Sequence, residues 1–390
     1  MICILLYPKG SQPMKNIAIL GFGTVGSGVA KVLTDNCSLI ADRIGEEVRI
    51  KYILDLREFP DSPFADRITH DYNVILNDPD VSLVAEMMGG SHPAYEFTKS
   101  ALAAKKSVVT SNKEVVANFG TELLKIAKEN RVSYMFEASV GGGIPIIRPL
   151  INDLAPNKIL SVSGILNGTT NYILTQMIGH GESFDHALAE AQKKGFAEAD
   201  PSADVDGLDA ARKIAILSAL SYGALIPPDR VHTEGIRGIT EEDVRLAHEN
   251  GYAIKLIGKT ELSDGKVLSM VSPRFVPLSS PLASVGGVFN GVLVDTDMVG
   301  EVMFYGQGAG KLPTAGAVCA DIVDILSHRF EDRRAPVFED ATDESIADFS
   351  TYVSKNCFLR DGEFLGTDTL SETDADKKAK HLGARRYRIL

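Results

Sequence analysis

Residues 15–26, KNIAILGFGTVG, decide the fold of the first half of the chain. Asn16–Leu20 is a short apolar run typical of a strand. It leads directly into the glycine pattern G-x-G-x-x-G, and Val25–Leu33 then has helical composition. In such a unit the first glycine permits a tight turn, the second lets the backbone approach a pyrophosphate, and the third lets the helix pack on the strand. The helix N-terminus offers free N–H groups to the phosphates. This pattern predicts a dinucleotide site made by Gly21, Phe22, Gly23, Thr24, Val25 and Gly26.

Strands and helices continue to alternate as far as Phe136. The expected strands are Val48–Leu54, Ser82–Met87, Ser107–Thr110 and Val132–Phe136, and the expected helices are Ala94–Ala104 and Glu114–Glu129. This alternation predicts a parallel sheet with ligands at the carboxyl ends of its strands. Two of these ends carry candidate site residues, Gly89 and Lys113. Lys113 would meet cofactor or substrate there, although a solvated lysine in the first turn of a helix fits the spacing equally well.

The end of the second expected strand should set the choice between NAD and NADP. Asp55 lies about 30 residues past the glycines rather than about 20, because Asp35–Glu47 forms a longer connection. A carboxylate here bonds the ribose 2′-hydroxyl of NAD, whereas Arg57 nearby would receive the 2′-phosphate of NADP. The two signals conflict and leave both coenzymes open.

The second half of the chain begins with a glycine-rich bend, Gly141–Pro145. The bend leads into an apolar helix expected over Ile146–Leu154, and a strand over Ile159–Leu166 follows. After Asn167 and Gly168, the polar side chains of Thr169, Thr170 and Asn171 can then cap a helix that starts near Tyr172.

A β-rich stretch later in the chain predicts an open sheet. Its expected strands are Tyr252–Leu262, Lys266–Val276, Val288–Leu293 and Glu301–Tyr305. A last helix, from the Gly306–Thr314 bend through Leu326, is expected to fold back onto the nucleotide domain. This would place Gly308 near the cofactor.

An unusually acidic segment carries the second candidate site. Residues 195–213 read GFAEADPSADVDGLDAARK, with five carboxylates ahead of Lys213. Asp209 and Lys213 are four residues apart on one face of an expected helix, where a carboxylate and an ammonium can meet. Acids around one lysine suit a substrate that carries a positive amine and a group that gains or loses a proton. An ordinary surface ion pair is the alternative for this spacing.

The composition excludes several classes of protein. A chain of 390 residues is expected to form about two or three domains, and a net charge of −12 argues against a nucleic-acid partner. The scattered cysteines and histidines indicate neither a disulfide framework nor a zinc site, so a reducing cytoplasm is the expected compartment. The longest apolar run, Ile214–Ile226, is too short to span a membrane. Residues 1–13 are expected to be an extension rather than a signal peptide.

Six motifs, taken in order, resemble those of homoserine dehydrogenases. They are GFGTVG, TSNKE, EASVGGGIP, GILNGTTNYIL, GFAEADPSADVDGLDAARK and GQGAGKLPTA, and they cover the chain from Lys15 to Phe330. The resemblance implies reversible, NAD(P)-linked interconversion of L-homoserine and L-aspartate 4-semialdehyde, in the route to threonine and methionine. It also implies an α/β fold with a Rossmann-type doubly wound parallel sheet and an α+β catalytic and dimerisation region with an open sheet. A homodimer is expected.

The implied organisation has four parts. They are the extension 1–13, a Rossmann domain over 14–140 completed by 306–330, the catalytic and dimerisation region 141–305, and a C-terminal segment 331–390. Related enzymes often carry a regulatory ACT domain at the C-terminus. The charged, weakly patterned residues 331–390 contain no recognisable intact one.

The resemblance also implies roles for single residues. Lys213 would be the catalytic acid or base, and Lys113 would assist at the nicotinamide end. Substrate contacts would come from Glu198 and Asp209, with Gly195 beside them. A monovalent cation, Na⁺ or K⁺, would be held by the Glu137 side chain and the carbonyl groups of Val140, Gly142 and Ile144.

Two other functions fit part of the sequence. An oxidoreductase acting on an acyl phosphate would need a cysteine nucleophile in a motif, and none of the four cysteines stands in one. A non-catalytic NAD-binding regulator would not need Lys113, Glu198, Asp209 and Lys213 together. Turnover of L-homoserine with NAD(P) separates the dehydrogenase from both.

Overall fold

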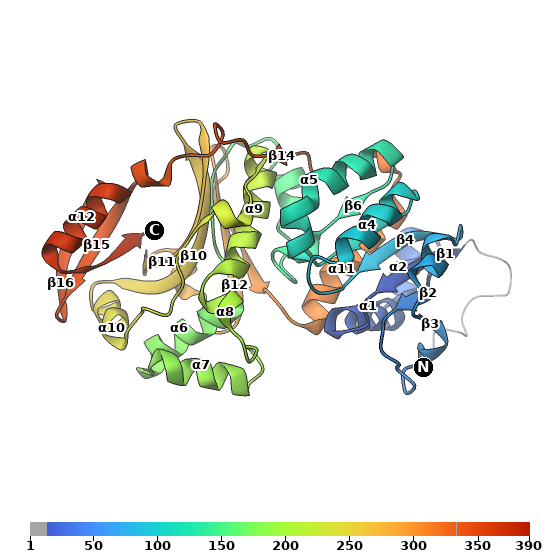
Figure 1. Ribbon diagram of the computed structural model, residues 1–390, viewed down its shortest axis with the longest axis horizontal. Helices are drawn as coiled ribbons and strands as arrows, with labels where there is room; N and C mark the ends of the chain where they lie inside the picture. The colour runs from blue at the N-terminus through green and yellow to red at the C-terminus, as the bar shows by residue number, and fades with distance from the viewer. Residues whose placement is uncertain (1–13, 333) are drawn as a thin grey trace. The chain divides into compact units, whose positions relative to one another are not determined.

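The computed structural model describes residues 14–332 and 334–390, which fold into two compact units (Figure 1). The first unit comprises the chain up to Asp153 with Ala309–Val337, and the second comprises Leu154–Gly308 with Phe338–Leu390. The expected N-terminal extension, residues 1–13, lies outside the described residues.

A six-stranded parallel sheet forms the centre of the first unit, which confirms the Rossmann-type fold. Its strand order is β3-β2-β1-β4-β5-β6. The strands are β1 (Met14–Leu20), β2 (Glu47–Leu54), β3 (Ile68–Thr69), β4 (Val81–Glu86), β5 (Ser107–Thr110) and β6 (Tyr134–Met135). The direction of strand order reverses between β1 and β4, so their carboxyl ends mark the usual ligand position of such sheets.

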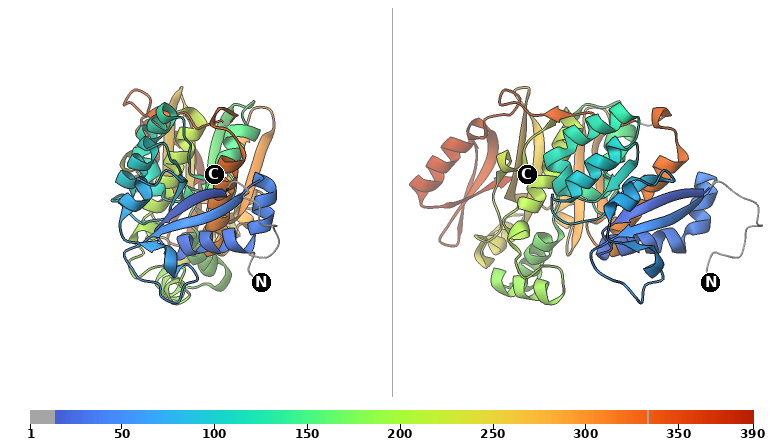
Figure 2. Two further views of the ribbon diagram at one scale, coloured as in Figure 1. Left: turned by 90° about the vertical axis from the view of Figure 1, so that its right-hand side faces the viewer. Right: turned by 45° about the vertical axis from the view of Figure 1, so that its right-hand side comes forward.

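Helices cover both faces of this sheet (Figures 1 and 2). They are α1 (Thr24–Asp35), α2 (Cys37–Ile44), α3 (Tyr72–Leu76), α4 (Ala94–Ala103), α5 (Lys113–Asn130) and α11 (Lys311–Ser327). Val29 of α1, Ile40 of α2 and Ile322 of α11 belong to one hydrophobic cluster with β1 and β2. The close approach of α1 and α11 requires a glycine, because a Cβ added at Gly28 would lie 2.7 Å from the carbonyl oxygen of Lys311.

A nine-stranded sheet forms the centre of the second unit. Its order is β13-β12-β7-β10-β11-β17-β15-β16, and β9 also pairs with β11. The strands of this unit are β7 (Ile159–Ile165), β8 (Ala224–Leu225), β9 (His232–Thr233), β10 (Tyr252–Ser263), β11 (Lys266–Pro277), β12 (Phe289–Thr296), β13 (Gly300–Gln307), β14 (Glu339–Asp340), β15 (Val353–Arg360), β16 (Glu363–Ser371) and β17 (Arg385–Ile389). The short strands β8 and β14 pair separately.

Helices of the second unit pack against this sheet, among them α6 and α9 (Figure 1). The helices are α6 (Gly168–His180), α7 (Phe184–Lys193), α8 (Ser202–Val205), α9 (Leu208–Tyr222), α10 (Glu241–Glu249) and α12 (Glu372–Leu382). Helix α9 is buried along most of its length, and Gly258 of β10 gives it room because a Cβ there would lie 3.4 Å from the Cβ of Ile214.

The C-terminal segment is more regular than its sequence indicates. Strands β15 and β16 form a hairpin, α12 follows, and β17 runs parallel to β11 with Arg388 opposite Arg274. The segment therefore continues the main sheet of the second unit. That it lacks an intact ACT domain stays a prediction.

The described cysteines differ in state. Cys319 and Cys357 are buried free thiols, and burial raises the pKa of each to about 12. Cys37 is disulfide-bonded, which the scattered cysteines of the sequence did not indicate. Within residues 14–332 and 334–390, no helix has the length and apolar character needed to cross a membrane. The cytoplasmic location stays a prediction.

A buried arginine ties the C-terminal strand to the rest of its unit. Arg388 is 2% exposed, and its guanidinium lies 2.6 Å from the carboxylate of Glu372 and 2.9 Å from that of Glu234. Burial alone would raise the pKa of Glu234, but hydrogen bonds from His232 and Arg388 outweigh it and lower the pKa to about 2. Both carboxylates therefore share this arginine, while Arg386 also pairs with Glu372 and His232 also pairs with the half-exposed Glu234.

Replacing this arginine should destabilise the second unit strongly. Arg388→Met removes the cation that Glu372 and Glu234 share and leaves Arg386 beside the buried Glu372, so we expect the free energy of unfolding at pH 7 to fall by about 3 kcal/mol. The deficit should shrink as the pH falls from about 5 toward 2, because protonation removes the contribution of a carboxylate whose folded pKa is lowered. Urea denaturation measures both effects. Arg245→Met, which removes an exposed pair with Glu249, is the control and should cost less than about 1 kcal/mol. Equal losses in the two variants would contradict the prediction.

Candidate active site

The turn after β1 passes so close to its neighbours that two of its positions accept only glycine. Gly21 has a φ of +88°, and a Cβ there would lie 2.9 Å from the carbonyl oxygen of Met87. A Cβ at Gly26 would collide with the carbonyl oxygen of Gly21. The chain therefore turns from β1 into α1 without side chains in the way, as a phosphate-binding turn requires.

Asp55, at the end of β2, is held against this turn. Its Oδ2 accepts hydrogen bonds from the backbone N–H of Phe22 (2.7 Å) and from Nη2 of Arg57 (2.9 Å). Its Oδ1 accepts from the backbone N–H and Nε of Arg57, both at 3.0 Å. The hydrogen bond from the Arg57 side chain lowers the pKa of Asp55 well below its usual range. The carboxylate is thus already engaged by four donors, while the Arg57 side chain is 62% exposed.

Two predicted site residues, Gly89 and Lys113, follow the neighbouring strands β4 and β5, and Asn112 links the two turns. Asn112 is the N-cap of α5, and its Oδ1 accepts hydrogen bonds from the N–H groups of Glu114 and Val115. Its Nδ2 donates to the carbonyl oxygen of Gly90 at 2.8 Å, beside Gly89. Lys113 is the first residue of α5 and is half-buried. Asn112 therefore fixes Lys113 relative to the turn that follows β4.

In the second unit, the predicted lysine–aspartate pair is buried rather than solvated. Lys213 is 8% exposed and Asp209 is 5% exposed, both on α9. The Nζ of Lys213 donates to Oδ2 of Asp209 at 2.9 Å and to the carbonyl oxygen of Leu166 at 2.7 Å. Burial at this level rules out the ordinary surface ion pair.

Two further residues join this pair, and their roles were missed from the sequence. The side-chain amide of Asn167 donates to Oδ2 of Asp209 at 2.9 Å and to Oδ1 of Asp204 at 2.7 Å. Burial raises the pKa of Asp204, and the nearby Asp209 carboxylate raises it further, against the hydrogen bond from Asn167. The sequence predicts a cap at Thr169–Asn171 and a helix start near Tyr172, whereas α6 begins at Gly168 with Asn167 as its N-cap. Asp204 is only one of the five carboxylates ahead of Lys213 in the sequence. The N-cap signal could have located Asn167, but not its second role.

Glu198 and Gly195 lie in an exposed stretch between α7 and α8. The backbone carbonyl of Glu198 accepts a hydrogen bond from Nε2 of Gln192, and that of Phe196 accepts one from Oγ1 of Thr169 on α6. Among the contacts of the described residues, none joins the Glu198 carboxylate to Lys213 or Asp209. Substrate contact by Glu198 and Gly195 stays a prediction.

Gly308 follows β13 and belongs to the second unit. A Cβ there would collide with the side-chain amide of Asn290 on β12, so packing alone requires a glycine at this position. Its predicted contact with the coenzyme stays a prediction.

The Glu137 carboxylate does not fit the cation site implied by the resemblance. Its Oε1 accepts from the N–H groups of Ile146 (2.7 Å) and Ile147 (2.8 Å). Its Oε2 accepts from the backbone N–H and the Nε of Arg148, at 2.8 and 3.3 Å. The carboxylate thus binds the start of a helical segment that ends in a π-helical turn, Pro149–Asp153, where a regular helix was expected.

A cation would also meet the guanidinium of Arg148 at this carboxylate. In the part of the chain that the structure describes, no group of three histidine, cysteine, aspartate or glutamate side chains could hold a metal ion. Cation binding by the carbonyl groups of Val140, Gly142 and Ile144 remains a prediction.

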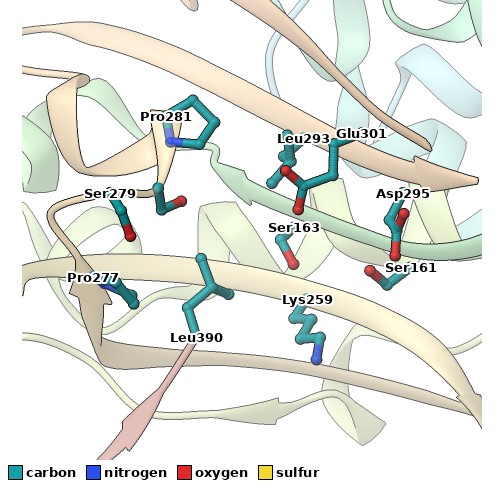
Figure 3. A pocket seen from close by; sticks show the side chains of 11 residues that line it. Ser161, Ser163, Lys259, Pro277, Ser279, Pro281, Leu293, Asp295, Glu301 and Leu390 are labelled. Atoms are coloured by element: carbon teal, nitrogen blue, oxygen red, sulfur yellow. The ribbon is translucent and has the colours of Figure 1, made fainter. Parts of the chain in front are cut away.

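A polar hollow of about 370 Å³ lies elsewhere in the second unit (Figure 3). Its lining includes Ser161, Ser163, Lys259, Asp295, Glu301 and Leu390, and the Leu390 side chain points into it. Gly258 faces α9, so its neighbour Lys259 points to the opposite face of the sheet. The hollow is therefore separate from the site around Lys213.

Comparison with known protein families identifies the family to which this chain belongs. Residues 21–137 match the model of the homoserine dehydrogenase NAD binding domain, and residues 145–323 match that of homoserine dehydrogenase. The chain is 45% identical over 317 residues to a homoserine dehydrogenase from Synechocystis, covering 80% of this chain and 73% of that protein. The chain belongs to the homoserine dehydrogenase family. It is therefore an NAD(P)-dependent oxidoreductase that interconverts L-homoserine and L-aspartate 4-semialdehyde, and the regulator hypothesis is not favoured.

Other homoserine dehydrogenases extend this match. The enzyme from Lactococcus lactis is 40% identical over 350 residues, covering 88% of this chain and 82% of that protein. A crystal structure of a homoserine dehydrogenase from Thiobacillus denitrificans superposes with a TM-score of 0.89 at 35% identity, covering 97% of this chain and 99% of that one. A hyperthermophilic archaeal homoserine dehydrogenase, solved in complex with NADPH, gives a TM-score of 0.70 at 31% identity, covering 83% and 99%.

Proposed function

We propose that Lys213 carries the proton in the homoserine dehydrogenase reaction. A bound nicotinamide coenzyme supplies or accepts the hydride. An ammonium group has three N–H donors, and Lys213 directs two of them to Leu166 and Asp209. The third can donate to the oxygen of the aldehyde as it becomes an alkoxide, and in the reverse direction the amine takes the hydroxyl proton. The support for this role is a buried lysine held at two points beside a cluster of acids.

The acids around Lys213 are suited to the ammonium group of the substrate. Asp204 and Asp209 share the amide of Asn167, so their carboxylates are held close together. We assign both to substrate binding, together with Glu198 and Gly195 from the exposed stretch before α8. On the first unit, Lys113 would assist at the nicotinamide end. Charge-assisted hydrogen bonds of this kind contribute about 1.5–3 kcal/mol each.

Removing the Lys213 amine should nearly abolish turnover while the first unit still binds coenzyme. We expect Lys213→Met to lower kcat for L-homoserine by about 10²–10⁴-fold, the contribution of a positioned acid or base. NADPH affinity should stay within about twofold, since the coenzyme residues proposed here lie mainly on the first unit. Lys193→Met, at an exposed lysine paired with Glu190, is the matched control and should keep wild-type turnover. A Lys213→Met variant that retains its kcat would overturn the proposed role.

We further propose a preference for NADP over NAD. The Asp55 carboxylate is engaged by Phe22 and Arg57, so it has little capacity left for ribose hydroxyl groups. Arg57 in turn presents an exposed guanidinium that suits a 2′-phosphate. The related archaeal enzyme solved with NADPH is consistent with this choice.

This preference predicts different effects on the two coenzymes. Arg57→Gln should raise KM for NADPH by about tenfold or more, because a charge-assisted bond of about 1.5–3 kcal/mol is lost. KM for NADH should change by less than about threefold, because NADH has no 2′-phosphate. Initial rates with each coenzyme measure this, and Arg49→Gln on the exposed side of β2 is the control. Equal increases for NADH and NADPH would refute the assignment.

We also propose that the chain forms a homodimer through the sheet face that carries the polar hollow. This face lies opposite α9, and Tyr305 of β13 adds an exposed aromatic side chain to it at 57% exposure. Light scattering should then give twice the chain mass of 42.0 kDa at micromolar concentration. A particle of one chain mass would contradict it.

A further inference from the structure

A fully buried carboxyl group lies at the carboxyl end of β4, beneath the turns that carry Gly89 and Lys113. Glu86 is the last residue of β4 and is 0% exposed. Its Oε1 accepts a hydrogen bond from the backbone N–H of Met88 at 2.6 Å, and its Oε2 accepts one from Oγ1 of Thr110 at 2.7 Å. Glu86 therefore joins the ends of β4 and β5 through its side chain.

The contacts of Glu86 continue into a closed ring of hydrogen bonds. Oγ1 of Thr110 accepts from the backbone N–H of Asn112 at 2.8 Å. The Asn112 amide then donates back to the carbonyl oxygens of Met88 at 3.3 Å and Gly90 at 2.8 Å. Since Asn112 is also the N-cap of α5, the position of Lys113 depends on this ring.

The surroundings of Glu86 shift the pKa of its carboxyl group toward neutral pH. Burial raises its pKa to about 7, and the hydrogen bonds from Thr110, Met88 and Asn112 only partly oppose this rise. The titratable group that faces it in the described residues is the phenol of Tyr134 on β6, whose own pKa is raised by burial and by Glu86. Within residues 14–332 and 334–390, burial and these hydrogen bonds account for the shift, and no positive side chain is among its causes. Glu86 therefore gains or loses a proton near neutral pH.

We propose that Glu86 is a positioning residue, whose ionised carboxylate fixes the turns that present Gly89 and Lys113 for the dehydrogenase reaction. Protonation turns one oxygen of Glu86 into a donor, and at Oε2 this donor competes with the Thr110 hydroxyl, which donates to the same atom. The ring must then rearrange, and with it the N-cap of α5. This inference rests on the coenzyme-side roles proposed above for Gly89 and Lys113.

The test compares wild type with Glu86→Gln, which mimics the protonated carboxyl group at every pH. We would measure kcat/KM for L-homoserine with saturating coenzyme from pH 6 to pH 8. With a pKa of about 7, the ionised fraction of Glu86 rises about tenfold over this range. The ratio of wild-type to variant activity should therefore rise about tenfold, because proton transfers common to both enzymes cancel. Glu122→Gln, at an exposed carboxylate on the same helix α5, should give a constant ratio near one.

A role limited to folding gives a different result. It would lower the activity of Glu86→Gln by the same factor at every pH, and a ratio that does not change with pH overturns the proposal. If Glu86→Gln does not fold, Glu86→Asp is the alternative variant, because it keeps a titrating carboxyl group on a side chain that is one methylene group shorter. The pH at which its activity breaks should then differ from wild type, and an unchanged break again overturns the proposal. Wild-type turnover of L-homoserine at pH 8 tests the dehydrogenase activity independently of Glu86.

Discussion

The buried pair of Lys213 and Asp209 is the constraint on which the second unit depends. Two charges removed from water are stable only when their remaining donors and acceptors are also satisfied. Here Leu166 supplies a carbonyl oxygen and Asn167 supplies an amide, and both follow directly after β7. Strand β7 is paired on both sides, with β10 and with β12, so its register fixes where these two groups lie. The sheet thus sets the geometry of the acid–base pair on α9.

The first unit meets the same requirement mainly with backbone amides, and Arg148 adds an opposite charge beside Glu137. Glu137 binds three consecutive N–H groups at the start of a helical segment, and Glu86 binds the N–H group of Met88. Two buried carboxyl groups of this unit, those of Asp321 and Glu86, ionise less easily than exposed ones. Burial raises the pKa of Asp321 to about 8 despite Arg148 nearby, and raises that of Glu86 to about 7. Acids of this kind can change charge near neutrality, whereas an exposed acid cannot.

The parts of this protein that were predictable from sequence depend on contacts between near neighbours in the chain. The glycine turn and the alternating strands are local patterns, and the spacing of Asp209 and Lys213 is a single helical turn. The engagement of the Glu137 carboxylate depends on a bend that returns the chain about ten residues later, which spacing alone does not show. The pairing of β17 with β11 joins residues more than a hundred positions apart, so the order of the C-terminal segment could not be seen locally. Asn167 has contacts of both kinds. The helix that it caps starts at the next residue, whereas Asp204 and Asp209, to which its amide donates, lie about 40 residues later in the chain.

Asparagine, rather than another capping residue, begins the helix at both proposed sites. Serine, threonine and aspartate cap helices as well as asparagine does, because each offers an oxygen to the first N–H groups. Only asparagine among them also carries an amide that can donate two hydrogen bonds. Asn112 uses its amide to hold the turn at Gly90, and Asn167 uses its amide to hold Asp204 and Asp209. In each case one side chain both starts a helix and fixes a neighbouring part of the site. An aspartate at either position would still cap the helix. In place of Asn167 it would repel the carboxylates of Asp204 and Asp209, and in place of Asn112 it would lack the donor to Gly90. The requirement for asparagine therefore comes from the site and not from the helix.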